Sequence, residues 1–175
     1  AAYGEAVGTI VGTSPAYTSL TFNAPIKSIT YDNVTNQVLS VKTSGGARQT
    51  AGLVDGVSFG GWVEVGELDV RFNASGTAAE IYGNVIGKND MGVEVNFIGQ
   101  KLFDVAGYTA RVGGVPTTFA PIIGSTQFGV GTTNTTLNGL AITSDAFNAI
   151  STALDLDTLG SSALSAAAAN FGNIN

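Results

Sequence analysis

The side chains that would let this chain act as an enzyme are mainly carboxylates. Paired acids cleave glycosidic bonds in several β-sheet hydrolases, and the candidates here are Glu64, Glu67, Asp69, Glu80 and Glu94. Glu67 and Asp69 share one face of a predicted strand, and Glu64 joins them only if that strand bulges at Gly66. The same pattern describes the ordinary solvated face of a sheet. The single tryptophan, Trp62, also offers little aromatic lining for a sugar cleft. A glycoside hydrolase is therefore a minor hypothesis.

The absence of two residue types excludes most other catalytic chemistry. The chain contains no histidine and no cysteine, which excludes Ser-His-Asp and Cys-His catalysis and histidine-ligated zinc. It also removes the usual general base near neutral pH. The sequence has no phosphate-binding glycine loop that opens a helix, and the glycine-rich residues 56–61 are typical of a turn. We therefore expect a protein that is not an enzyme and has no required cofactor.

Calcium is the ion that the sequence favours most, as a structural ligand of loops. Asp90 lies in a predicted hairpin loop, and Asp155 and Asp157 flank Leu156 near the end of the chain. Oxygen ligands of this kind suit Ca²⁺. Neither segment matches an EF-hand loop, and aspartate is equally common where it only forms a turn.

Tyrosine can bind haem iron, which keeps a carrier protein as the main alternative. The tyrosines are Tyr3, Tyr17, Tyr31, Tyr82 and Tyr108. Residues 137–159, "LNGLAITSDAFNAISTALDLDTL", are similar to the tails of secreted bacterial β-domains, and secreted haem carriers combine strands with helices. No functional residue is assigned to this chain from the resemblance. A tyrosine in a β-rich protein is more often part of the core or its rim.

Three Asn-X-Ser/Thr sequences are potential glycosylation sites. They begin at Asn33, Asn73 and Asn134, each in or beside a predicted turn. A glycan there would project outward, as expected of a protein at the cell exterior. In a chain rich in Asn and Thr, matches of this kind also arise by chance.

Composition gives the strongest indication of function. Charged residues make up 11% of the 175 residues, against about 25% in a typical domain, and glycine occurs 24 times. A surface of small, uncharged residues is easily desolvated, so copies can pack together over large areas. An ordinary extracellular β-domain with a Thr- and Asn-rich surface would also explain these values.

Charge and hydropathy exclude two kinds of partner. The net charge is -6 and the seven basic residues are scattered singly, so no patch follows a nucleic-acid backbone. No apolar run approaches the roughly 18 residues of a membrane-spanning helix. The start Ala1-Ala2-Tyr3 is typical of what remains after signal-peptidase cleavage. We expect a secreted protein, extracellular or at the cell surface.

The elements that would position these residues are mostly short strands separated by turns. We expect a single mainly β domain, an antiparallel sandwich or jelly-roll, with one or two short C-terminal helices within residues 143–170. The predicted strands cover residues 3–12, 16–22, 26–31, 37–43, 62–72, 79–86, 91–98, 101–105, 108–112, 126–130 and 136–142. Residues 44–46 are expected to form a loop, Val93, Val95 and Phe97 to point inward, and Phe147, Ile150 and Leu154 to form a helical stripe.

These observations favour a structural subunit of an extracellular assembly: a surface filament, pilus-like fibre, sheath or matrix. It would polymerise by strand pairing between copies, with residues 1–12 as a donated or edge strand. The donor residues would be Tyr3, Glu5, Ala6, Val7, Thr9, Ile10 and Val11. A secreted monomeric carrier of haem, lipid or carbohydrate is the alternative, and a virion structural protein is a variant of the first hypothesis.

Overall fold

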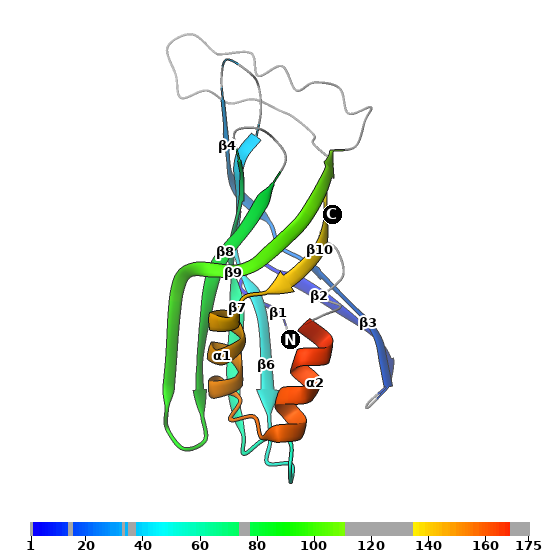
Figure 1. Ribbon diagram of the computed structural model, residues 1–175, viewed down its shortest axis with the longest axis vertical. Coiled ribbons are helices and arrows are strands. Elements are labelled where there is room, and N and C mark those ends of the chain that lie inside the picture. The colour runs from blue at the N-terminus through cyan, green and yellow to red at the C-terminus, as the bar shows by residue number, and fades with distance from the viewer. Residues whose placement is uncertain are drawn as a thin grey trace.

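The chain folds into an antiparallel curled sheet with a sandwich-like arrangement and two short C-terminal helices, as the sequence predicts (Figure 1). The computed structural model describes residues 2–13, 16–32, 34, 38–73, 78–110 and 135–168. Its elements are β1 (Ala2–Tyr3), β2 (Val7–Thr13), β3 (Ala16–Asn23), β4 (Ile26–Tyr31), β5 (Val38–Thr43), β6 (Gly46–Ala51), β7 (Gly61–Phe72), β8 (Ala79–Asn89), β9 (Glu94–Ala110), β10 (Thr135–Ile142), α1 (Ser144–Ala153) and α2 (Thr158–Ala168).

The main sheet is built around β7, because two successive strands share its length. On one side β7 pairs with β8, and the sheet continues through β9 to β10. On the other side β5 pairs with the second half of β7 and β6 pairs with its first half. Beyond them, β4 pairs with β5 and β1 pairs with β6. One edge of the sheet is therefore a broken line of β1 and β4, and the opposite edge is β10.

A β-bulge in β7 lies at the level where β5 gives way to β6. The register between β7 and β8 shifts between Gly66 and Asp69, and Glu67 adopts a φ of 49°. The Glu67 amide donates to the Gly45 carbonyl (3.0 Å), and the Gly45 amide donates to Glu67 Oε1 (2.7 Å). The bulge predicted from the change of apolar parity at Gly66 is confirmed.

Glycines align across the sheet at this level because neighbouring backbones approach too closely for a side chain. Gly45 has a φ of 74°, and a Cβ there would lie 2.5 Å from the Tyr3 carbonyl oxygen and 2.8 Å from the Ala6 nitrogen. A Cβ on Gly46 would lie 2.5 Å from Cε1 of the Tyr3 ring, and one on Gly66 would meet the Tyr3 hydroxyl. The Tyr3 ring therefore occupies the space that these glycines leave open. We call Gly45, Gly46 and Gly66 the glycine line.

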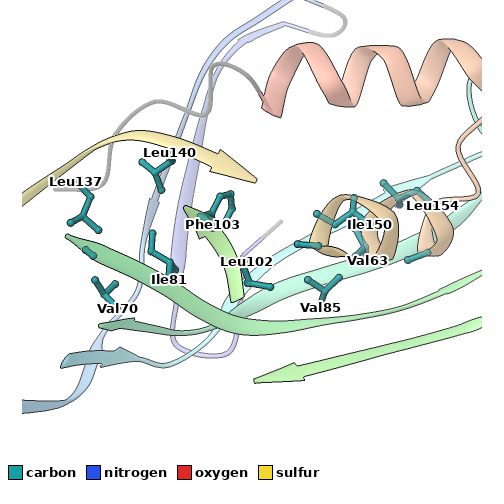
Figure 2. Packing of buried hydrophobic residues seen from close by; sticks show 13 residues of the cluster. Val63, Val70, Ile81, Val85, Leu102, Phe103, Leu137, Leu140, Ile150 and Leu154 are labelled. Atoms are coloured by element: carbon teal, nitrogen blue, oxygen red, sulfur yellow. The ribbon is translucent and has the colours of Figure 1, made fainter. Parts of the chain in front are cut away.

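The core lies on the inner face of the curled sheet (Figure 2). Alternate residues of β8 are buried, with Ile81 and Val85 fully enclosed. The helix α1 covers the part of this face formed by β7, β8 and β9. The buried cluster is Val63, Val70, Ala79, Ile81, Val85, Leu102, Phe103, Leu137, Leu140, Ala146, Ile150, Ala153 and Leu154.

Hydrogen bonds fix α1 on the sheet at its N-terminus. Thr143 is the N-cap, and its Oγ1 accepts from the Ala146 amide (3.3 Å), as the sequence predicts. The same hydroxyl donates to the Lys101 carbonyl (2.9 Å), and the Thr143 amide donates to the Leu102 carbonyl (2.9 Å). One residue therefore caps the helix and bonds it to β9.

The second helix packs on the loop between β6 and β7. The Leu159 amide donates to the Gly56 carbonyl (3.2 Å), and a Cβ on Gly160 would meet the Val57 carbonyl oxygen. Beside it, the buried Ser58 hydroxyl donates to the Leu154 carbonyl (2.6 Å) and accepts from the Gly60 amide (3.0 Å). This loop therefore bonds both to α2 and to the end of α1.

Several local expectations need correction. Residues 44–46 were expected as a loop, but β6 begins at Gly46, and residues expected as separate strands within 91–112 form the single strand β9 as far as Ala110. Val93 is 49% exposed because it precedes β9 in the hairpin turn. The buried face of α1 uses Ala146 and Ala153, whereas Phe147 is only partly buried. The strand expected at 126–130 lies outside the described residues.

We predict that Gly45→Ala lowers the free energy of unfolding by about 2 kcal/mol or more, because alanine is strained at this φ and its methyl group would meet the chain at Tyr3 and Ala6. Urea denaturation followed by circular dichroism would measure the loss. Gly52→Ala is the matched control, since no atom lies within 4 Å of a Cβ there. We expect a change within about 0.5 kcal/mol for the control. Equal losses in the two variants would contradict the role of the glycine line.

Candidate functional site

The most distinctive feature of the described chain is a hairpin that lies outside the main sheet. β2 and β3 pair only with each other as a separate two-stranded sheet. We call residues 7–23 the arm. In Figure 1 its two blue strands run from beside β1 to the lower right of the view. The arm leaves after β1 and returns at β4, so it interrupts the broken edge of the main sheet.

Both ends of the arm are fixed at the glycine line. The Ala6 amide donates to the Tyr3 carbonyl (3.3 Å), and Ala6 is buried against Gly45. At the returning end, the Ser44 amide donates to the Pro25 carbonyl (3.0 Å). The chain therefore enters and leaves the arm on either side of Ser44 and Gly45.

The arm presents two strand edges that carry no charge. No Asp, Glu, Lys or Arg occurs between Glu5 and Lys27. Val7 is 64% exposed and Thr9 is exposed. Apart from β1, no helix or strand of the described part contacts the arm extensively. Free strand edges invite pairing with another chain, and monomeric proteins usually protect them with charges.

The structure divides the expected donor strand at Gly4, where a φ of 64° turns the chain. Tyr3 lies in β1 and pairs with Gly46. Glu5 accepts a hydrogen bond from the Ser44 hydroxyl (3.0 Å), and Ala6 is buried. The remaining donor residues lie in β2 and pair with β3 of the same chain: Val7, Thr9, Ile10 and Val11. Pairing of these residues with another copy stays a prediction.

The carboxylates considered for catalysis lie along β7, β8 and the start of β9. Each forms an ion pair with a lysine or an arginine. Their partners are Arg48 for Glu64 (3.1 Å), Lys27 for Glu67 (3.9 Å), Arg71 for Asp69 (2.9 Å), Lys101 for Glu80 (2.7 Å) and Lys88 for Glu94 (3.2 Å). Hydrogen bonds from Lys101 and Tyr82 lower the pKa of Glu80. A general acid needs the opposite shift, so Glu80 is suited to an ion pair.

Several of these pairs join into a continuous row across the outer face of the sheet. We call this row the outer-face ladder; its members are Lys42, Asp69, Arg71, Tyr82, Glu80, Lys101 and Asp104. The Arg71 guanidinium lies 3.8 Å from the Tyr82 ring centroid. All six basic residues of the described part lie within 4.0 Å of a carboxylate oxygen. This face therefore neutralises its own charges.

The aspartates considered for calcium have roles in the backbone of loops and caps. The Asp90 amide donates to the Gly60 carbonyl (3.1 Å), and the Asp155 carbonyl accepts from Phe59 (2.9 Å). Asp157 Oδ1 accepts from the Thr158 amide (2.7 Å) at the start of α2. Among the described residues, no three acidic side chains gather as a metal site requires. Calcium binding stays a prediction.

The structure describes the side chains of only some of the tyrosines and glycosylation candidates. Tyr82 donates to Glu80 (3.1 Å), and Tyr3 covers the glycine line. The side chains of Tyr17, Tyr31 and Tyr108 lie outside the described residues. Of the glycosylation candidates, Asn73 follows β7 and its Oδ1 accepts from the Ala78 amide (3.1 Å). Asn33 and Asn134 lie outside the described residues.

Comparison with protein-family models, with curated proteins and with solved structures finds no match to this chain. Within the described residues, neither helix has the length and apolar character needed to cross a membrane.

We predict that Tyr3→Phe makes the protein less sensitive to alkaline unfolding. Burial, and then the charges of Glu64 and Glu67, raise the pKa of Tyr3 above its usual 10.0. Above about pH 10 the unfolded chain ionises this tyrosine before the folded protein does, so the free energy of unfolding falls as the pH rises. Urea denaturation between about pH 8 and pH 11 would show a smaller fall for Tyr3→Phe. Tyr82→Phe is the control for the loss of one phenol. Its free energy of unfolding should fall with rising pH as much as that of the unmodified protein.

Proposed function

We propose that this protein is a structural subunit of an extracellular assembly, such as a surface filament, pilus-like fibre, sheath or matrix. Copies would be joined by β-strand pairing through the arm. The observation that carries the proposal is an uncharged two-stranded hairpin whose outer edges have no neighbouring strand among the described residues. The protein would be secreted and would act at the cell exterior.

The physical reason is that a lone hairpin is only marginally stable in water. The N–H and C=O groups on its outer edges have no strand partner among the described residues. A strand from another copy would supply a further row of main-chain hydrogen bonds and remove an exposed edge. Pairing between subunits therefore stabilises the arm as well as the assembly.

The charge distribution supports the same proposal. Only 11% of the residues are charged, and the described bases are already paired with acids on the main sheet. Because the arm itself carries no charge, pairing through it buries no charged side chain of the arm. A tail-tube or capsid-decorating protein of a virus would use the same interaction, so that setting belongs to this proposal.

We predict that deleting the arm leaves a folded monomer that no longer assembles. Residues 7–24 would be replaced by two glycines, because Ala6 and Pro25 lie on either side of Ser44 and Gly45. None of the deleted residues belongs to a strand of the main sheet, and none belongs to the core cluster of the described side chains. Electron microscopy of the intact protein should show regular filaments, tubes or lattices, and the deletion variant should show dispersed particles with unchanged thermal unfolding. Regular assemblies formed by the deletion variant would refute the proposal.

We also predict that charges on the arm prevent assembly without removing it. The double variant Val7→Lys, Thr9→Lys places two charges at exposed positions of β2, where lysine is a natural means of edge protection. The control is Met91→Lys, at an 80% exposed position in the hairpin between β8 and β9. Sedimentation velocity should show loss of large species for the double variant only. Loss in both would indicate a general effect of charge.

A further inference from the structure

Several strand edges of the main sheet have no neighbour among the described residues, and they differ in charge. They include β1, β4, residues 48–51 of β6, residues 94–101 of β9, and β10. β4 carries Lys27, and β6 carries Arg48, whose guanidinium lies 4.1 Å from the Trp62 ring centroid. β10 contains no charged residue. β10 is therefore the longest of these edges without the usual charge protection of an edge strand.

The β10 edge is held in place by the core. Leu137 and Leu140 are 3% and 6% exposed, and Figure 2 shows them close to Phe103 and Ile81. The chain then passes through the Thr143 cap into α1. Gly139, with a φ of 61°, divides the edge into residues 135–138 and 140–142. Because the core already holds β10 in place, the edge loses little conformational entropy when another strand pairs with it.

The two edges of the arm are not equivalent. Val11 pairs with Ser19 while Gly12 pairs with Tyr17, so β3 carries one extra residue, Thr18, at the register shift. A bulge of this kind blunts an edge for further pairing. β2 keeps the regular edge, and its seven residues are comparable with the eight of β10.

We propose that β2 of one copy adds to the free edge of β10 in the next copy, so that the acceptor for the arm is β10. This inference rests on the proposed function. The arm leaves the sheet at the β1 and β4 edge, and the acceptor lies at the opposite edge. Donor and acceptor surfaces are therefore different, and such a head-to-tail contact builds rings or open filaments instead of a two-fold dimer.

Mixed single-cysteine variants test the contact, because the native chain has no cysteine. Thr9→Cys would be mixed with Asn138→Cys or Ala141→Cys on β10, assembled and oxidised. A disulfide forms only when the two Cα atoms are within about 7 Å. Controls pair Thr9→Cys with Ser28→Cys on β4 or Gln49→Cys on β6, both exposed positions. Non-reducing gels and mass spectrometry would identify heterodimers.

The expected result is a Thr9 heterodimer with at least one β10 variant, and no heterodimer above background with β4 or β6. Assemblies that form without a β10 heterodimer, or that give equal yields with β4 or β6, would overturn this inference and leave the proposed function standing. If the unmodified chain forms no assembly, the proposed function and this inference fail together. Electron microscopy of each oxidised mixture separates these outcomes.

Discussion

The paired hydrogen bonds between Gly45 and Glu67 hold the main sheet together where three of its strand lines are interrupted. At this one level β7 bulges, β5 gives way to β6, and the edge formed by β1 and β4 opens. Interruptions at different levels would leave unpaired backbone groups at each of them. Because the interruptions coincide, backbone groups left unpaired at one of them can bond to backbone groups at the adjacent one. The Tyr3 ring covers the glycines that allow the backbones to approach.

The arm follows from this arrangement. Since β1 and β4 lie along one edge line with their gap at the glycine line, the chain can leave the sheet at Tyr3 and return at Ile26, where the β4–β5 register shifts between Ile26 and Ser28. The core depends on β7 to β10 and α1, none of which includes arm residues. In the proposed assembly, this arrangement would let the body fold before the arm pairs with another copy.

The sequence predicts the parts of the fold that local patterns control. Alternation in residues 62–72 gives the faces of β7, and the parity change at Gly66 gives its bulge. β6 was missed because "GARQTA" has no apolar alternation; its pairing is dictated by β7. The arm was not predicted as a separate element, because alternation shows that a segment is a strand and not which strand lies beside it. The ion pairs of the outer-face ladder likewise depend on register between distant strands.

The unequal lengths of β1 and β4 have a mechanical consequence. Tension applied to the arm reaches the body at both of its roots, through a two-residue strand on one side and a six-residue strand on the other. The short root should yield first, so that Tyr3 lifts from the glycine line while β4 remains paired with β5. In the proposed assembly, a copy under tension would lengthen by releasing β1 from β6 while the rest of its main sheet stays paired.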